Sequence, residues 1–201
     1  MKKLVLIDGN SIMNRAFYAT MGRNFTSPDG KPTNALYGFL QILFRIVEDE
    51  KPNYLAVSFD LKGENKRKQI YSEYKAGRHS MPEDLRIQMD MIKDILRKMN
   101  IPIYEKAGEE ADDILGTISK KITKNHEIKV CILTGDRDYF QLVDSKIYIK
   151  YPKTSLGKTE YIIYDEEKIK TEYTLLPNDL IELKALMGDS SDNIPGVKGI
   201  G

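Results

Sequence analysis

The chain has 201 residues, of which 41% are apolar and 30% charged, and its formal net charge is +1. This length suits one domain with a substantial core. The balanced charge excludes binding to nucleic acid through an overall basic surface, so any such surface must come from local charge asymmetry.

No apolar run approaches the length of a membrane span, so no membrane partner is expected. The single cysteine, Cys131, lies in an apolar run and cannot form an internal disulfide. A lone cysteine of this kind is typical of the core of a protein in a reducing compartment. We therefore expect a cytoplasmic protein.

Apolar runs typical of strands alternate along the chain with apolar residues at helical spacing. The predicted strands cover 4–8, 54–60, 101–105, 129–135 and 146–150, with 159–163 as a further strand or hairpin arm. The predicted helices cover 10–20, 33–50, 82–99, 110–123 and 175–188. This alternation predicts an α/β fold with a mostly parallel central sheet flanked by helices.

Acidic residues gather where the carboxyl ends of these strands are expected, which is where active sites lie in such sheets. They are Asp8 and Asp60 at strand ends, Glu110, Asp112 and Asp113 at the start of the helix 110–123, Asp136 and Asp138 after the fourth strand, and Asp189 and Asp192 after the last helix. A single acid of this kind could simply cap a turn or a helix. Carboxylates that share a site repel one another, however, and divalent cations with oxygen ligands relieve that repulsion. The set therefore predicts a metal site, which Asp113 fits least well because one of two adjacent helical acids usually faces away.

A polar segment, residues 61–81, leaves the predicted sheet directly from Asp60. Its basic residues are Lys62, Lys66, Arg67, Lys68, Lys75 and Arg78, against Glu64 and Glu73. The segment could be a solvated helix or loop, but its starting point places its cations over the acids, where they would attract an anionic substrate. Lys75 and Arg78 are our candidates for contacting the scissile phosphate, and Tyr74 offers a flat face to a base.

The sequence ends in a glycine-rich stretch that contains Gly196, Lys198, Gly199 and Gly201. Glycines in this pattern expose backbone groups suited to a phosphate or a monovalent ion. The same pattern is also common in simple turns.

These motifs together resemble the 5′-nuclease (flap endonuclease-like) domain found at the N-terminus of bacterial DNA polymerase I. The matching stretches are LVLIDGN followed by Arg15, FD at 59–60, YKAGR at 74–78, EADD at 110–113, TGDRDYFQL at 134–142 and MGDSSDNIPGVKGIG at 187–201. The resemblance covers the whole chain in order. It implies a PIN-like 5′-nuclease fold with a helical arch over about 61–85. It also implies two catalytic divalent metal ions, normally Mg²⁺ with Mn²⁺ as a substitute, and cleavage of DNA at 5′ flaps or 5′ ends in replication and repair.

By position, the resemblance assigns all nine acids to the metal site and Lys75 and Arg78 to the base of the arch as catalytic cations. The expected DNA contacts are Arg15, Arg67, Tyr74, Lys198, Gly196, Gly199 and Gly201. Relatives continue through a helix–three-turn–helix that binds duplex DNA and K⁺, and only its start, at 189–201, is present here. We therefore expect weaker binding to duplex DNA, K⁺ as a candidate ligand of the incomplete motif, and a monomer fused to or acting with a DNA polymerase.

We hypothesise that two metal ions hydrolyse a phosphodiester while Lys75 and Arg78 offset the charge on the phosphate. The first ion would be surrounded by Asp8, Asp60, Glu110 and Asp112, and the second held by Asp136, Asp138, Asp189 and Asp192, partly through water.

Three alternatives are a haloacid dehalogenase-type phosphatase, a PIN-type ribonuclease and a module that binds branched DNA without cutting it. The first needs a second acid two residues after Asp8, where Asn10 stands. The arch segment and the glycine-rich ending disfavour the second, and the complete acid set disfavours the third.

Overall fold

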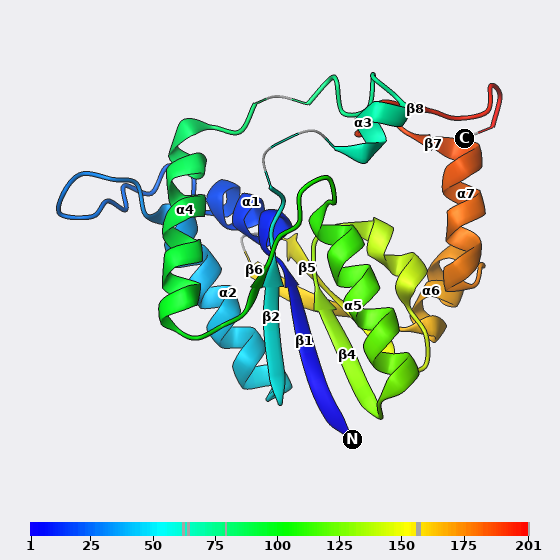
Figure 1. The fold of residues 1–201 in the computed structure, drawn as a ribbon, viewed down its shortest axis with the longest axis horizontal. Coiled ribbons are helices and arrows are strands. Elements are labelled where there is room, and N and C mark those ends of the chain that lie inside the picture. Colours follow the sequence, from blue (N-terminus) through cyan, green and yellow to red (C-terminus); the bar gives the residue numbers. More distant parts are fainter. Residues whose placement is uncertain (62, 64, 79, 156–157, 201) are drawn as a thin grey trace.

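A six-stranded sheet forms the centre of the computed structural model, which describes residues 1–200 except 62, 64, 79 and 156–157 (Figure 1). The strands are β1 (Lys2–Asp8), β2 (Tyr54–Ser58), β3 (Ile103–Tyr104), β4 (Ile128–Leu133), β5 (Ile147–Ser155) and β6 (Lys158–Tyr164). Their order is β3-β2-β1-β4-β5-β6, and only the β5–β6 pair is antiparallel. The predicted α/β fold with a mostly parallel sheet is therefore confirmed. The predicted roles of Lys62 and Gly201 fall outside the described residues.

Helices cover both faces of the sheet, because successive residues of a strand point to opposite sides. On β1, Val5 and Ile7 face one hydrophobic core, while Leu4 and Leu6 face the other. The first core is closed by α1 (Gly9–Ala19), α2 (Asn34–Glu50) and α4 (Glu83–Lys98). The second is closed by α5 (Ala111–Asn125), the 3-10 helix η1 (Arg137–Leu142), α6 (Glu166–Tyr173) and α7 (Leu180–Met187).

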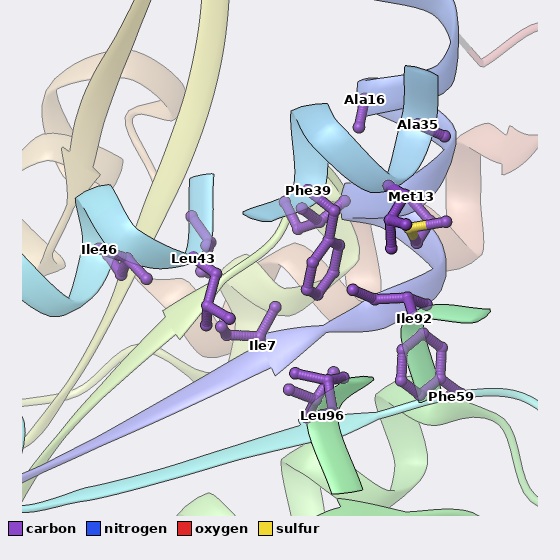
Figure 2. Close-up of a cluster of buried hydrophobic side chains, with 14 of the residues drawn as sticks. Ile7, Met13, Ala16, Ala35, Phe39, Leu43, Ile46, Phe59, Ile92 and Leu96 are labelled. Atoms are coloured by element: carbon purple, nitrogen blue, oxygen red, sulfur yellow. The ribbon is translucent and has the colours of Figure 1, made fainter. Parts of the chain in front are cut away.

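The first core is built mainly from large aliphatic and aromatic side chains (Figure 2). Phe39 and Leu43 of α2 lie with Ile92 of α4 over Ile7 of the sheet, and all four are at most 1% exposed. Cys131 of β4 belongs to the same core, is fully buried, and its burial raises the pKa of the thiol to about 12. The cysteine is therefore a core residue, as its apolar surroundings in the sequence indicate.

Some elements differ from their predicted bounds. The predicted strand 101–105 shrinks to the two residues of β3, and the predicted helix 175–188 is divided into the 3-10 helix η2 (Pro177–Asp179) and α7. Pro177 stands in the first turn of η2, where its missing N–H is tolerated. Helix α6 has no apolar period that predicts it, because Ile169 is the one buried residue among its eight.

Two segments lie beyond the carboxyl ends of the parallel strands and cover that edge (Figure 1). One is the described part of the polar segment 61–81, which contains the short helix α3 (Lys66–Ile70), and the other is the hairpin of β7 (Gly188–Asp189) and β8 (Ile194–Pro195). They are joined by a backbone bond from the N–H of Lys75 to the carbonyl of Asp192, at 2.9 Å. Within the described part of the chain, no helix has the length and apolar character required to cross a bilayer.

Candidate metal centre

A cavity of about 990 Å³ opens at the carboxyl ends of the strands, beneath the segment 61–81. Eight of the nine predicted acids line it: Asp8, Asp60, Glu110, Asp112, Asp136, Asp138, Asp189 and Asp192. Five residues of the polar segment line the same cavity: Arg67, Tyr74, Lys75, Arg78 and Met81. We call this space the acid cavity. It brings together side chains that are separated by up to about 180 residues of sequence.

The ends of β1 and β4 position the deepest acids. Asp8 is the last residue of β1 and caps α1, accepting hydrogen bonds from the Ser11 N–H and the Thr134 hydroxyl, both at 3.0 Å. Thr134 follows β4, and its hydroxyl also accepts from the Asp136 N–H at 3.0 Å. The chain turns to opposite sides of the sheet at these two neighbouring strands, which is where an open α/β sheet forms its crevice.

The end of β2 is tied to the start of α5. Asp60 accepts a hydrogen bond from the Ala111 N–H at 2.7 Å, while the Asp60 N–H donates to Asn10 at 2.9 Å. Glu110 caps α5, and it also accepts from Tyr74 at 3.0 Å and from Lys75 at 2.6 Å. Hydrogen bonds from backbone and side-chain donors, most of them distant in sequence, therefore hold these carboxylates in place.

Burial and mutual repulsion make several of these carboxyls poor anions in the isolated chain. Burial is the main cause that raises the pKa of Asp8 to about 6 and that of Asp112 to about 7, and neighbouring carboxylates add to both shifts. Burial also raises the pKa of Asp136. Carboxyls of this kind are stabilised in their charged form by a nearby cation.

The buried hydroxyl of Tyr139 also suits a cation near these carboxylates. Tyr139 is 1% exposed, its pKa is raised by burial and by the charges of Asp8, Asp112 and Asp136, and its oxygen has no hydrogen-bond partner among the described residues. Hard oxygen donors gathered around an unsatisfied polar atom fit Mg²⁺, which binds carboxylates and keeps several waters.

Four cations of the chain neutralise the acids in this structure. Lys75 pairs with Glu110, and Arg78 pairs with Asp192. Lys184 of α7 pairs with Asp138 and, at 2.7 Å, with Asp189. The fourth cation, Arg67, binds Asp113 through two hydrogen bonds. Among the described residues, no three acids stand together as ligands of one ion.

Asp113 is the one predicted acid that does not line the acid cavity. Arg67 donates to both of its carboxylate oxygens, at 2.7 and 2.8 Å. Burial opposes ionisation of Asp113, but the hydrogen bonds from Arg67 outweigh it and the pKa is lowered. Asp113 also closes the capping box of α5 with Glu110. These contacts explain Asp113 as an anchor of the segment 61–81.

Lys184 is a site residue that the sequence analysis missed. It lies in the middle of a predicted helix, where its neighbours do not distinguish it from a surface lysine. Burial opposes the lowered pKa of Asp189, but hydrogen bonds from Lys184 and Ser191 hold it at about 2. Lys184 contacts both Asp138 and Asp189 because α7 packs beside η1, an arrangement that the sequence pattern does not predict.

The predicted DNA contacts at the two ends of the chain lie outside the acid cavity. Arg15 donates to Thr154 of β5 at 2.6 Å. Gly196 packs so tightly that a Cβ there would lie 2.2 Å from the Met187 carbonyl, and Gly199 has φ of +87°. Both glycines thus have structural explanations, and their DNA contacts, like that of the exposed Lys198, stay predictions.

Comparison with known proteins agrees with this arrangement. The family described as "5'-3' exonuclease, N-terminal resolvase-like domain" matches residues 3–174. The chain is 46% identical over 199 residues to DNA polymerase I of Caldicellulosiruptor bescii and 44% identical over 201 residues to that of Bacillus subtilis. These alignments cover 99% and 100% of this chain, respectively. They cover only 23% and 22% of the length of the two polymerases, so the chain spans less than a quarter of these relatives.

The fold also matches a solved bacteriophage T5 flap endonuclease, described as a pseudo-enzyme–product complex with DNA and metal ions. The TM-score is 0.76 at 24% identity, covering 100% of this chain and 71% of the other. At this identity the likeness concerns the fold.

Proposed function

Because this chain belongs to the 5′-3′ exonuclease N-terminal resolvase-like domain family, we propose that it is a metal-dependent 5′-nuclease that hydrolyses DNA at 5′ flaps or free 5′ ends. The observation that carries this proposal is the acid cavity, in which eight carboxylates face the cations of the segment 61–81. Such a cavity suits a phosphodiester, because it combines oxygen ligands for metal ions with positive charge for a polyanion. The segment 61–85 would then act as the arch over the DNA strand.

The proposed cofactors are two Mg²⁺ ions, with Mn²⁺ as an alternative. Their ligands would be Asp8, Asp60, Glu110 and Asp112 for the first ion and Asp136, Asp138, Asp189 and Asp192 for the second. When bound, such ions supply Lewis-acid chemistry, which favours ionisation of water and offsets charge on the phosphate. Asp113, as the anchor of Arg67, would contribute to this site through the position of α5 and not through a metal bond.

The basic residues of the segment 61–81 would bind and orient the phosphate. Lys75 and Arg78 are held at the rim by Glu110 and Asp192, so both would exchange a carboxylate for a phosphate oxygen when substrate enters. Tyr74, whose hydroxyl donates to Glu110, would bring its ring toward a base. Arg67 would fix the segment to α5 while the other cations change partners.

Contacts farther from the cavity complete the proposal. Arg15 would contact the DNA backbone, as would Lys198 with the glycine-rich stretch of Gly196, Gly199 and Gly201, where K⁺ is a candidate ligand. The large polymerase relatives suggest action together with DNA polymerisation, in replication or repair.

Asp136→Asn tests the catalytic assignment. The amide keeps the cap on η1, which Asp136 makes to the Asp138 N–H at 2.9 Å, but it removes a metal-binding charge. We expect the rate of flap cleavage in Mg²⁺ to fall by about 100-fold or more, with an unchanged melting temperature in EDTA. Asp94→Asn, at an exposed acid of α4, is the matched control and should cleave like the wild type.

The same assay separates the alternatives. Cleavage of single-stranded RNA in preference to flap DNA would favour a PIN-type ribonuclease, and tight binding of branched DNA without cleavage in Mg²⁺ would favour a non-catalytic module. Full activity of Asp136→Asn would refute the assignment of the site.

A further inference from the structure

A second cavity, of about 420 Å³, lies between the β5–β6 hairpin, α1 and α6. Its charged lining residues are Arg15, Arg137, Lys153, Lys168 and Glu172. We call it the hairpin pocket. Four cations against one carboxylate make it strongly basic in a chain whose net charge is only +1.

The single acid of the hairpin pocket pairs with only one of its four cations among the described residues. Glu172 pairs with Lys168 at 3.4 Å and accepts a hydrogen bond from Tyr164 at 3.2 Å. Arg15 donates to a neutral hydroxyl, that of Thr154, and the Arg137 guanidinium lies 6.0 Å from the ring centroid of Tyr151. Neither arginine forms an ion pair with a carboxylate of the described residues, and neither does the exposed Lys153. Unpaired arginines grouped in a cavity are suited to a phosphate, whose oxygens accept two hydrogen bonds from one guanidinium.

The hairpin pocket adjoins the acid cavity. Arg137 and Tyr151 line both spaces, so they form the boundary between them. Arg137 also stands between Asp136 and Asp138 in the sequence, which fixes it beside two of the proposed metal ligands. An anionic strand with one phosphate at the acid cavity can therefore continue past Arg137 into a basic region.

We propose that the hairpin pocket binds an internal backbone phosphate of the same nucleic-acid strand, near the phosphate in the acid cavity. The ligands are Arg15, Arg137, Lys153 and Lys168. This proposal rests on the proposed function, and it adds Arg137, Lys153 and Lys168 to the residues that hold the substrate. The pocket sets the register of the strand, because phosphate contacts position a nucleic acid without reading its bases.

The double substitution Lys153→Gln and Lys168→Gln tests the pocket without changing the acid cavity. Binding of a fluorescent 5′-flap DNA is measured by anisotropy in EDTA over a series of salt concentrations. Loss of one phosphate contact should weaken binding about fivefold to tenfold near 0.1 M salt and reduce the slope of log K against log salt by about 1. The matched control, Lys121→Gln with Lys124→Gln on the exposed side of α5, removes the same charge away from both cavities and should bind like the wild type. Lys153→Gln alone, at an exposed position, serves if the double variant does not fold.

A second arm locates the phosphate. Flap DNAs that carry one neutral methylphosphonate linkage are scanned across the positions on both sides of the cleavage site. One internal position should weaken binding to the wild type and to the control more than to the double variant, because Lys153 and Lys168 no longer contribute to that contact while Arg15 and Arg137 remain.

The outcomes separate the two proposals. If the wild type cleaves flap DNA in Mg²⁺ but the double variant matches the control in affinity and salt slope, the hairpin pocket is not a phosphate site and the proposed function stands. The proposal for the hairpin pocket is also contradicted if affinity falls only when a terminal 5′-phosphate is removed. It is likewise contradicted if no internal methylphosphonate weakens binding. If the wild type neither binds nor cleaves flap DNA, both proposals fail.

Discussion

Glu50, the last residue of α2, is the centre of a buried polar cluster. It is 9% exposed and accepts hydrogen bonds from Lys3 and Lys150 at 2.8 Å and from Tyr148 at 2.6 Å. Burial alone would raise its pKa, but these donors outweigh the burial and lower the pKa to about 2. The cluster joins α2 to β1 and β5, so its charge contributes to the stability of the sheet and one helical layer.

We expect Glu50→Gln to lower the free energy of unfolding by about 2 kcal/mol at pH 7. Because the pKa of Glu50 is lower in the folded chain than its ordinary value of 4.5, this stability is present above about pH 4.5 and is lost as the pH falls toward 2. Urea unfolding of both proteins from pH 7 to pH 3 measures the difference, which should shrink below pH 5.

Glu48→Gln, at an exposed residue of the same helix, should change the free energy of unfolding by less than about 0.5 kcal/mol. A difference between wild type and Glu50→Gln that stays constant over the whole pH range would contradict the role given to this charge.

At the scale of elements, the crossing of α1 and α2 depends on a glycine. A Cβ on Gly38 of α2 would lie 2.9 Å from the Cβ and 3.3 Å from the Cα of Ala16 on α1. In α5, by contrast, a Cβ on Gly116 would meet only the methyl groups of Leu142, at 3.5 and 3.6 Å. The same substitution should therefore have opposite effects in the two helices.

Gly116→Ala should raise the free energy of unfolding by about 0.5–1 kcal/mol, because alanine is the better helix former. Gly38→Ala should lower it by about 1–2 kcal/mol, since overpacking at the crossing outweighs that gain. Urea unfolding of the two variants in parallel measures both changes. Equal changes of the same sign would show that the distance between α1 and α2 does not limit the side chain at position 38.

The elements that the sequence predicts well are those with a strong apolar period. The bounds of α2, α4 and β4 differ from prediction by two residues or fewer at each end, because their buried faces are continuous. Helix α6 lacked such a face, and its main signal was its cap, Asp165, followed by two glutamates. Short elements held by caps and tertiary contacts are therefore the ones that a periodic pattern misses.

The candidate site also has parts that the sequence predicts and parts that it does not. The strand-end positions of Asp8 and Asp60 follow from the order of strands, so the acid cavity could be predicted. The partners of Lys184 and Arg67 could not, since they depend on how α7 and the segment 61–81 fold over the sheet. The hairpin pocket was missed for the same reason, because its cations come from four separate elements.

For the whole molecule, a net charge near zero conceals a strong separation of charge. Acids whose ionised form is disfavoured, such as Asp8 and Asp112, share one cavity with the cations Arg67, Lys75, Arg78 and Lys184. A bound divalent ion would relieve that repulsion in the folded chain alone, which stabilises it by mass action.

We therefore expect Mg²⁺ at about 100 times its Kd to raise the Tm of the wild type by about 5–10 °C, which corresponds to about 2.7 kcal/mol. Differential scanning fluorimetry in Mg²⁺ and in NaCl of equal ionic strength measures the shift. The double variant Asp136→Asn with Asp138→Asn should lose the part of the shift that comes from the second ion, whereas Asp94→Asn should keep the whole shift. An equal shift in NaCl would mean that general screening, not a metal site, stabilises the chain.

The burial of Cys131 has a practical consequence for following the segment 61–81 in solution. The only thiol of the chain lies in the core with its pKa raised to about 12, so almost none of it is the nucleophilic thiolate at neutral pH. A maleimide dye would therefore react very slowly with the native cysteine. The exposed Ser72 could be changed to cysteine, and the dye would then label that position alone. Fluorescence from that one position would report how the segment moves as a strand enters beneath it, in a protein whose interior remains native.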